Sequence, residues 1–372
     1  MIPLSLYIHV PWCVRKCPYC DFNSHERSDI PEQAYLAALI EDISGDLQQV
    51  AGRRIETVFI GGGTPSLMSG GFYQTLFSEI RQRIEIAADA EITLEANPGT
   101  LEQGRFEAYR AAGINRLSIG VQSFNPAHLQ ALGRIHGKDE AIRAAEAARR
   151  AGFDNFNLDL MHGLPGQGRE QALADLEQAI ALKPTHLSWY ELTIEPNTAF
   201  FNNPPEQPDS DEMADTEEAG FALLARHGFE RYEISAFAQP GRRCRHNLNY
   251  WQFGDYLGIG AGAHGKITDA DGRIVRYQKT RLPEHYLAGG DRTRQQRWLE
   301  PDELPMEYFL NTLRLIEGAP ARLFEERTRL PLDTLSATLT SLRSKQLLTP
   351  EISNIACSPL GIRHLNWVLE AF

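Results

Sequence analysis

Short runs of β-branched and aliphatic residues alternate with longer helical segments along the first 235 residues, and this alternation limits the fold more than any other feature. The runs are Leu4–Val10, Thr57–Ile60, Glu91–Ala96, Asn115–Val121, Asn155–Leu160 and His186–Leu192. The segments between them carry apolar residues at helical spacing, such as Leu36, Leu39, Ile40 and Ile43. Strands that alternate with helices form sheets that are mainly parallel, so the sequence predicts an α/β fold.

Three of the predicted helices end in the same way, with a glycine followed by an apolar residue. These pairs are Gly113-Ile114, Gly152-Phe153 and Gly228-Phe229. Glycine adopts the left-handed conformation that closes a helix, because it has no Cβ to clash. About six such strand and helix units are visible, whereas a complete (β/α)8 barrel needs eight. The sequence therefore predicts a partial (β/α)6 barrel that is open.

The regular alternation ends near residue 236, and two further segments follow. Residues 237–300 are rich in glycine and are expected to connect the barrel of residues 1–236 to a smaller helical domain of residues 301–372. The helical spacing there falls on Tyr308, Leu310, Leu313 and Leu315, then on Leu335, Leu339 and Leu342, before a short strand at 346–348. Helices followed by a small β element predict a winged-helix-like domain. Its acids and bases are nearly balanced, whereas a DNA-binding domain needs a basic face, which favours a packing role.

The net charge of the chain limits the kinds of partner that it can bind. The chain has 37 Lys plus Arg against 49 Asp plus Glu, a net charge of −12. Such a surface repels phosphates, so nucleic acid is excluded as the main partner. We find no basic leader and no apolar run near the ~18 residues of a membrane span, so we expect a cytoplasmic protein. A local, peripheral membrane contact remains compatible with this sequence.

Three of the five cysteines lie within eight residues, at Cys13, Cys17 and Cys20, with the spacing C-x3-C-x2-C. They follow the first predicted strand, where three thiolates can converge on one centre. A structural zinc site normally has a fourth protein ligand, for which His9 and His25 are the nearest candidates. A [4Fe-4S] cluster held by three thiolates instead keeps one iron open to a ligand that is not protein. The spacing favours the cluster, with zinc as the alternative.

The residues around these cysteines resemble a known signature. The segment from Tyr7 to Cys13 reads YIHVPWC, and the third cysteine is followed by Asp21 and Phe22. This segment resembles radical S-adenosylmethionine (SAM) proteins, in the branch of the oxygen-independent coproporphyrinogen III oxidases and their relatives. The resemblance implies a [4Fe-4S] cluster whose open iron is chelated by SAM. It also implies a partial barrel of the radical SAM type followed by a smaller helical domain.

Residues at the predicted strand ends are candidates for binding SAM. The run GGGTP after the second strand lets backbone amides approach a ligand, and barrel ligands bind at the carboxyl ends of strands. In the family, matching positions contact the amino group, ribose, adenine side and carboxylate of SAM. The resemblance assigns SAM binding to Tyr7, Tyr19, Gly62, Gly63, Thr64, Glu95, Gln122, Arg134 and Asp159. An arginine can pair with the carboxylate, and an acid can accept hydrogen bonds from the ribose hydroxyls.

A second motif and two departures distinguish this chain from the oxidases. They carry a fourth cysteine where this chain has Phe22, and a long segment before the cluster, where only 12 residues precede Cys13. The motif H-N-x-x-Y-W resembles the segment typical of HemW-type heme chaperones, and it consists here of His246, Asn247, Tyr250 and Trp251. A heme site needs an axial ligand and aromatic surfaces. His246 is the predicted ligand, with Cys244 as an alternative thiolate.

The resemblance implies a chaperone that binds heme as cargo and transfers it to apo-hemoprotein acceptors, such as respiratory-chain proteins. It carries the cluster and SAM, which could organise a homodimer or trigger release. No residue is assigned a catalytic role. The alternative is a radical SAM oxidase in porphyrin metabolism that acts on coproporphyrinogen III or a related porphyrinogen.

Overall fold

A computed structural model describes residues 2–50, 52–99 and 104–372, and it contains a large mixed sheet. The sheet has 12 strands in the order β14-β13-β12-β11-β1-β4-β5-β6-β7-β8-β10-β9. Six neighbouring parallel strands match the six predicted runs: β1 (Leu4–Val10), β4 (Ile55–Gly62), β5 (Ile86–Ala96), β6 (Arg116–Gln122), β7 (Phe156–His162) and β8 (His186–Glu191). The strand order has two free ends, so within the described residues the barrel is open, as predicted.

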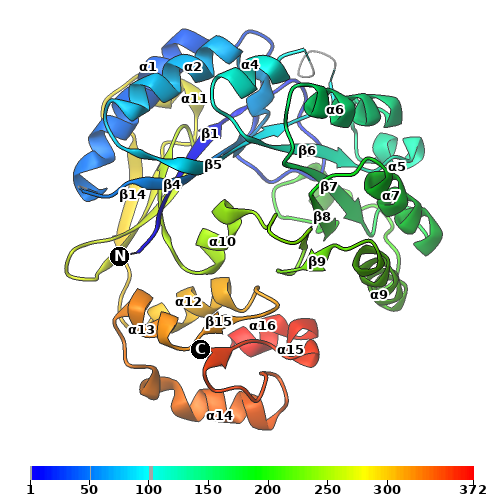
Figure 1. Cartoon of the computed structure of the whole chain (residues 1–372), viewed down its shortest axis with the longest axis vertical. Helices are drawn as coiled ribbons and strands as arrows, with labels where there is room; N and C mark the ends of the chain where they lie inside the picture. Colours follow the sequence, from blue (N-terminus) through cyan, green and yellow to red (C-terminus); the bar gives the residue numbers. More distant parts are fainter. Residues whose placement is uncertain (1, 51, 100–103) are drawn as a thin grey trace.

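Helices follow the six parallel strands, and the longer helices cover the outer face of the sheet (Figure 1). They are α1 (Glu32–Asp46), α2 (Gly70–Arg81), α4 (Phe106–Ala111), α5 (Pro126–Ala131), α6 (Lys138–Arg150), α7 (Arg169–Ala181), α8 (Ala199–Asn202) and α9 (Ser210–Arg226). Polar side chains cap the N-termini of helices α2 and α9. The Ser69 side chain accepts a hydrogen bond from Phe72 N at α2, and the Asp209 side chain accepts one from Asp211 N at α9. Short 3-10 turns lie at Leu47–Val50, Pro65–Leu67 and Leu332–Leu335.

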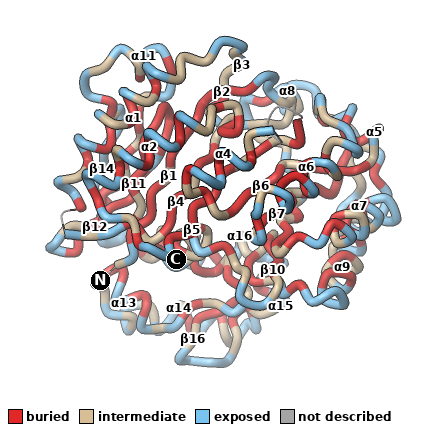
Figure 2. The backbone as a smooth tube through the Cα atoms, turned by 45° about the horizontal axis from the view of Figure 1, so that its top comes forward, coloured by how far each residue is buried: buried red, intermediate tan, exposed pale blue. Residues whose placement is uncertain are grey.

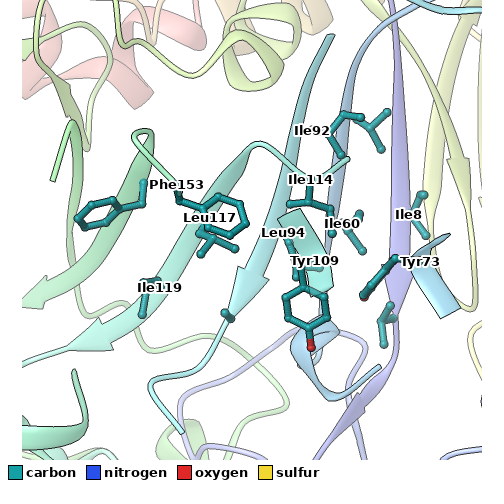
Figure 3. Close-up of a cluster of buried hydrophobic side chains, with 14 of the residues drawn as sticks. Ile8, Ile60, Tyr73, Ile92, Leu94, Tyr109, Ile114, Leu117, Ile119 and Phe153 are labelled. Carbon is teal, nitrogen blue, oxygen red and sulfur yellow. The ribbon is translucent and has the colours of Figure 1, made fainter. Parts of the chain in front are cut away.

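The core lies between the strands and these helices. Buried aliphatic residues of neighbouring strands, including Ile8, Ile60 and Leu94, pack in one layer with Tyr73 and Tyr109 from the helices (Figure 3). The strands are buried along most of their length, whereas the outer helices are exposed on one side (Figure 2). Burial of this apolar surface is the main favourable contribution to folding. It also fixes the strand ends, where the candidate residues stand.

The predicted glycine caps are confirmed. Gly113, Gly152 and Gly228 have φ values of +101°, +84° and +80°. Each lies just beyond a helix, namely α4, α6 and α9. This left-handed region is costly for residues with a Cβ, which explains the glycine at each position.

Residues 237–300 are more than a connection, and this part of the prediction needs correction. They contain α10 (Arg245–Trp251), α11 (Pro283–Leu287) and the strands β11 (Asp255–Ile259), β12 (His264–Thr268), β13 (Ile274–Lys279) and β14 (Thr293–Trp298). Strand β11 pairs in parallel with β1, and the next three strands extend the sheet in antiparallel order. The strands β9 (Glu230–Arg231) and β10 (Ala236–Ala238) extend its other end. The frequent glycines concealed these strands from the sequence pattern, because backbones and rings pack directly against them: a Cβ on Gly258 would stand 1.8 Å from the carbonyl oxygen of His264.

The last segment forms a small helical unit with its own core. It contains α12 (Leu304–Thr312), α13 (Arg322–Thr328), α14 (Ser336–Ser344), α15 (Pro359–Arg363), α16 (Leu365–Leu369) and a two-stranded sheet of β15 (Ala319–Pro320) and β16 (Asn354–Ile355). The predicted strand at 346–348 is wrong, since only Leu348 forms an isolated bridge, with Cys357. Leu310 and Leu315 also depart from the pattern, because Leu310 is 51% exposed and α12 ends before Leu315. Among the helices described, none is long and apolar enough to cross a membrane.

Helix α10 occupies a central place in this arrangement. It lies between the sheet and the C-terminal helices (Figure 1), and it contacts β1, β4 and α12. The H-N-x-x-Y-W motif falls on this helix. The motif therefore stands where the barrel meets the C-terminal unit.

Candidate cluster and cofactor site

The three clustered cysteines lie on a loop that backbone hydrogen bonds hold in place. Cys13 ends the short strand β2 (Trp12–Cys13), which pairs with β3 (His25–Glu26). The backbone N–H of Cys20 donates to the carbonyl of Cys17 at 3.1 Å, and that of Arg27 donates to the carbonyl of Cys13 at 3.0 Å. The loop therefore begins and ends at fixed points of the fold.

All three thiols are free and face the same cavity. Burial raises the pKa of Cys13 and Cys20 above the usual value for a thiol, so metal binding there must displace protons. Among the described residues, no three His, Cys, Asp or Glu side chains are grouped closely enough to hold one metal ion. In a cubane cluster each cysteine binds a different iron, so the thiolates stand further apart than the ligands of one ion. The choice of a cluster rather than a zinc ion therefore stays a prediction from the sequence.

A cavity of about 220 Å³ adjoins the cysteine loop at the carboxyl ends of the parallel strands. Eight of the nine residues predicted to bind SAM line it: Tyr19, Gly62, Gly63, Thr64, Glu95, Gln122, Arg134 and Asp159. Ligands of barrel folds bind at this end of the strands. The structure therefore brings together residues that span 141 positions of the sequence, from 19 to 159, beside the three cysteines.

The glycines after β4 fit tightly against the cysteine loop. Gly63 N donates to the carbonyl of Val10 at 2.7 Å, and Thr64 N donates to the carbonyl of Trp12 at 2.7 Å. A Cβ on Gly63 would lie 2.5 Å from the Trp12 carbonyl oxygen, which belongs to the backbone and cannot turn away. Glycine is therefore required here to bring the floor of the cavity against the strand that carries Cys13.

We expect Gly63→Ala to displace the cysteine loop from β4 and to cost about 1–3 kcal/mol of unfolding free energy. Iron content after anaerobic reconstitution and SAM affinity measured by calorimetry should both fall. Gly71→Ala is the matched control, because the nearest atom to its Cβ is 3.9 Å away. Unchanged iron content and SAM affinity in Gly63→Ala would contradict the role given to this glycine.

Two half-buried carboxyl groups face the cavity. Glu95 lies at the end of β5 and accepts a hydrogen bond from Gly62 N at 3.1 Å. Burial and the nearby Asp159 raise the pKa of Glu95 to about 8. Asp159 accepts from Ser118 Oγ at 2.9 Å and from Asn157 Nδ2 at 2.8 Å. It stands in the middle of β7 rather than at its end, so its predicted position was wrong by three residues, although it still lines the cavity.

Gln122 and Arg134 complete the wall beside Cys17. Gln122 ends β6 with φ of +68°, and its buried Oε1 has no hydrogen-bond partner among the described residues. An orphaned acceptor on a cavity wall fits a site that binds a polar ligand. Arg134 donates to Asn97 Oδ1 at 3.0 Å and to the Gly120 carbonyl at 2.6 Å, and its Nη1 lies 3.7 Å from Cys17 Sγ. This guanidinium places a positive charge beside the cysteine loop, which would offset the negative charge of a thiolate-bound cluster.

The sequence prediction missed several residues of this cavity, among them three with polar side chains. Asn97 donates to Thr64 Oγ1 at 3.1 Å, and Tyr190 and Ser118 also line the wall. Tyr190 stands near the end of β8, and Asn97 follows β5 directly. Glu95 was predicted because ligands of barrels bind at the carboxyl ends of strands. The same rule would have found Tyr190 and Asn97, which stand at that end of β8 and β5.

The ninth predicted residue, Tyr7, lines a different cavity. This second cavity measures about 670 Å³ and shares Phe22, Gly62 and Glu95 with the first. The hydroxyl of Tyr7 lies 3.0 Å from His9 Nδ1, and both residues line this cavity together with Tyr250 of α10. The two cavities are therefore neighbours with a common wall.

Some residues of the motif on α10 line this second cavity, and others lie in the interior. Tyr250 and Trp251 line the cavity. His246 is fully buried, with its Nδ1 2.8 Å from Thr57 Oγ1 and its Nε2 2.9 Å from Tyr250 Oη. Burial lowers its pKa to about 3. Both ring nitrogens are thus engaged, and a ligand role for His246 requires Thr57 or Tyr250 to move; that role stays a prediction.

The remaining members of this segment have local partners. Cys244 is buried, its Sγ donates to Glu91 Oε1 at 3.3 Å, and burial raises its pKa to about 12. It is a thiol at neutral pH, which does not support the alternative thiolate ligand. Asn247 is half-buried on α10 and does not line the second cavity. Glu91 also accepts from the backbone N–H groups of Arg245 and His246, so it anchors the start of the helix.

Comparison with known proteins decides the family. The profile of the radical SAM superfamily matches residues 7–179. The protein named Heme chaperone HemW of Escherichia coli strain K12 is 52% identical over 371 residues, which cover 100% of this chain and 98% of that protein. The chain belongs to the HemW family of radical SAM proteins. A Lactococcus lactis protein of the same name is 33% identical over 100% of this chain and 97% of its own length.

A solved structure is similar in fold over nearly the whole chain. The solved structure of coproporphyrinogen III oxidase (HemN) from Escherichia coli, described as a radical SAM enzyme, superposes with a TM-score of 0.83 at 24% identity, over 99% of this chain and 90% of that chain. At that identity the match establishes the fold, and it confirms the radical SAM type of the predicted barrel. A [4Fe-4S] cluster and SAM are typical of the family. The free thiols, the close-fitting glycines and the orphaned Gln122 oxygen fit both groups.

Proposed function

We propose that this protein is a heme chaperone, which binds heme as cargo and transfers it to apo-hemoproteins, and which carries a [4Fe-4S] cluster and SAM. The observation that carries the proposal is the 670 Å³ cavity beside the candidate cofactor site, walled by Tyr250 and Trp251 of the H-N-x-x-Y-W motif. Its volume lies within the range of about 300–1,000 Å³ for cofactor pockets. The relatives named as heme chaperones match the whole length of the chain and support the assignment.

The two cavities suggest a division of roles. Cys13, Cys17 and Cys20 would hold the cluster, and the eight residues of the smaller cavity would hold SAM. The two cavities share the wall of Phe22, Gly62 and Glu95, so a ligand of the larger cavity would lie next to SAM in this arrangement. Occupancy by SAM can then alter the affinity for heme through direct contact, without cleavage of SAM.

The test uses the anaerobically reconstituted full-length protein. Hemin should bind at one equivalent and give a shifted Soret band, and addition of an apo-hemoprotein should move the heme to that acceptor. In a parallel sample, reductant, SAM and coproporphyrinogen III should give no protoporphyrinogen. Oxidation of coproporphyrinogen without heme transfer would instead establish the alternative, a radical SAM oxidase.

The affinity for SAM should depend on pH through Glu95. Its raised pKa of about 8 leaves the carboxyl protonated at pH 7 before SAM binds. The ionised form accepts hydrogen bonds from ribose hydroxyls more strongly, so binding favours loss of that proton. We therefore expect SAM affinity to rise as the pH increases toward about 8 and to level off above it.

Calorimetric titrations of the wild type and Glu95→Gln across this pH range provide the measurement. The amino group of SAM also titrates near neutral pH, but it does so with both proteins. The difference between the two pH curves therefore reports Glu95. Parallel curves would show that the Glu95 proton is not linked to binding.

A further inference from the structure

The walls of the 670 Å³ cavity differ in chemistry. Aromatic side chains, Tyr250, Trp251 and Tyr256, line one part. The antiparallel strands β12 and β13 form another, where His264 pairs with Gln278 and Lys266 pairs with Arg276. Arg281 follows β13 at the rim. A flat aromatic ligand with carboxylates matches this combination of rings and cations.

The histidines near the cavity differ in whether a ring nitrogen is free. His246 uses both nitrogens, as described above. His9 also uses both, with Nδ1 3.0 Å from Tyr7 Oη and Nε2 2.9 Å from the Asn23 carbonyl. His264 is exposed on the cavity wall, and neither of its ring nitrogens has a hydrogen-bond partner among the described residues. A metal ligand needs a neutral imidazole with a free lone pair, which His264 alone of these three offers without rearrangement.

We propose that His264 is the axial ligand of the heme iron, and that Arg281 pairs with a propionate carboxylate of the same heme. This inference rests on the proposed function, because it names the residues that hold the cargo. In this arrangement Tyr250 and Trp251 supply the surface on which the porphyrin packs, and His246 positions Tyr250 through its hydrogen bond.

The charges around His264 support this assignment. Partial burial lowers the pKa of His264, and Arg276 and Arg281 lower it further, so the ring is neutral at pH 7. Arg276 donates to Glu307 Oε2 at 2.9 and 2.6 Å and is already paired. The guanidinium of Arg281 is exposed and has no hydrogen bond or ion pair among the described residues. It is therefore available to a carboxylate that enters the cavity.

Exposure of both groups also suits a cargo that must leave. Neither His264 nor Arg281 has to be withdrawn from the core to bind heme or to release it. By contrast, ligation through His246 would break one of its two hydrogen bonds, to Thr57 or to Tyr250, at a fully buried ring. A ligand at the rim lets an acceptor protein reach the heme edge and replace the imidazole.

The experiment titrates hemin and iron-free protoporphyrin IX into the anaerobic full-length protein and into variants. In His264→Ala, hemin affinity should fall at least about tenfold and the Soret band should shift, because the iron loses its ligand. Affinity for iron-free protoporphyrin should not change. Added imidazole should restore the wild-type spectrum in this variant. His227→Ala, at an exposed histidine after α9, is the matched control and should behave as wild type.

Arg281 is tested separately through the carboxylates. Arg281→Ala should weaken hemin binding by up to about fivefold, the range of an exposed ion pair. The same substitution should leave the affinity for hemin dimethyl ester unchanged, because the ester has no charged carboxylate. An equal loss with both compounds would overturn the pairing with Arg281.

The outcomes separate this inference from the proposed function. If the wild type binds no hemin, the proposed function fails, and the ligand assignment fails with it. If the wild type binds hemin and both His264→Ala and His264→Gln keep its spectrum and affinity, His264 is not the ligand and the chaperone proposal stands. A spectral change in His246→Ala alone would transfer the ligand role to His246. Circular dichroism confirms that each variant is folded.

Discussion

Replacement of Cys17 by serine is expected to abolish binding of the iron–sulfur cluster. A serine hydroxyl does not ionise near neutral pH, and a cluster with two thiolates left loses one of its three anchors to the protein. Cys17 is half-buried, and its thiol lies at the cavity wall 3.7 Å from Arg134 Nη1, so serine should fit without disturbing the core. Iron and sulfide should fall from about four per chain to near zero, with loss of the brown chromophore. SAM affinity should fall with them, because in the proposed arrangement SAM binds the open iron.

The control for this result is Cys357→Ala. Cys357 is also a free cysteine, but it is buried in the core of the C-terminal unit. Its removal should leave iron content and SAM affinity unchanged. Retention of a full complement of iron in Cys17→Ser would show that this loop does not hold the cluster, and stoichiometric zinc in the wild type would restore the alternative of a zinc site.

The barrel could be predicted because its signals are local. Each parallel strand is a short apolar run, and a glycine follows several helices where the chain must turn in the left-handed region. The strand β6, for example, was predicted at 115–121 and found at Arg116–Gln122. Such features depend on residues that are close in the sequence. They can therefore be recognised without knowledge of the rest of the fold.

The strands of residues 237–300 could not be predicted in the same way. Gly258 and Gly265 interrupt the apolar pattern because the chain packs closely there. A Cβ on Gly265 would lie 2.1 Å from the ring of Tyr277, which crosses from β13. The requirement for glycine arises from a contact between strands, which no local pattern reveals.

In the candidate site, too, local signals could be predicted and contacts between distant residues could not. The cysteine spacing and the strand ends indicated the cofactor cavity, where eight predicted residues meet. The state of each histidine could not be read from the sequence. His246 belongs to a recognisable motif but is enclosed by Thr57, Tyr250 and Phe59, whereas His264 belongs to no motif and faces a cavity. Whether an imidazole is free depends on neighbours that are distant in the sequence.

Asp255→Asn is expected to lower the free energy of unfolding by about 3–5 kcal/mol. The Asp255 carboxylate is fully buried and accepts from Lys266 Nζ and Arg53 Nη1, each at 2.8 Å, and from Thr268 Oγ1 at 2.9 Å. Burial alone would raise its pKa, but Lys266 and Arg53 outweigh burial and hold the pKa below its usual value. An amide would leave the ammonium of Lys266 in the core without a counter-charge. This carboxylate also stabilises the fold at neutral pH and loses that contribution only when acid protonates it.

Chemical denaturation at pH 7 measures the effect, and two further variants identify its cause. Glu326→Gln removes the acid of an exposed pair with Arg322, at 3.7 Å, and should change the unfolding free energy by no more than about 0.5 kcal/mol. Adding Lys266→Met to Asp255→Asn removes the stranded charge and should recover part of the loss. If the double variant is as unstable as the sum of its single substitutions, the loss comes from broken hydrogen bonds at the start of β11. If it recovers, the buried charge pair is the feature that holds β11 and β12 together behind the 670 Å³ cavity.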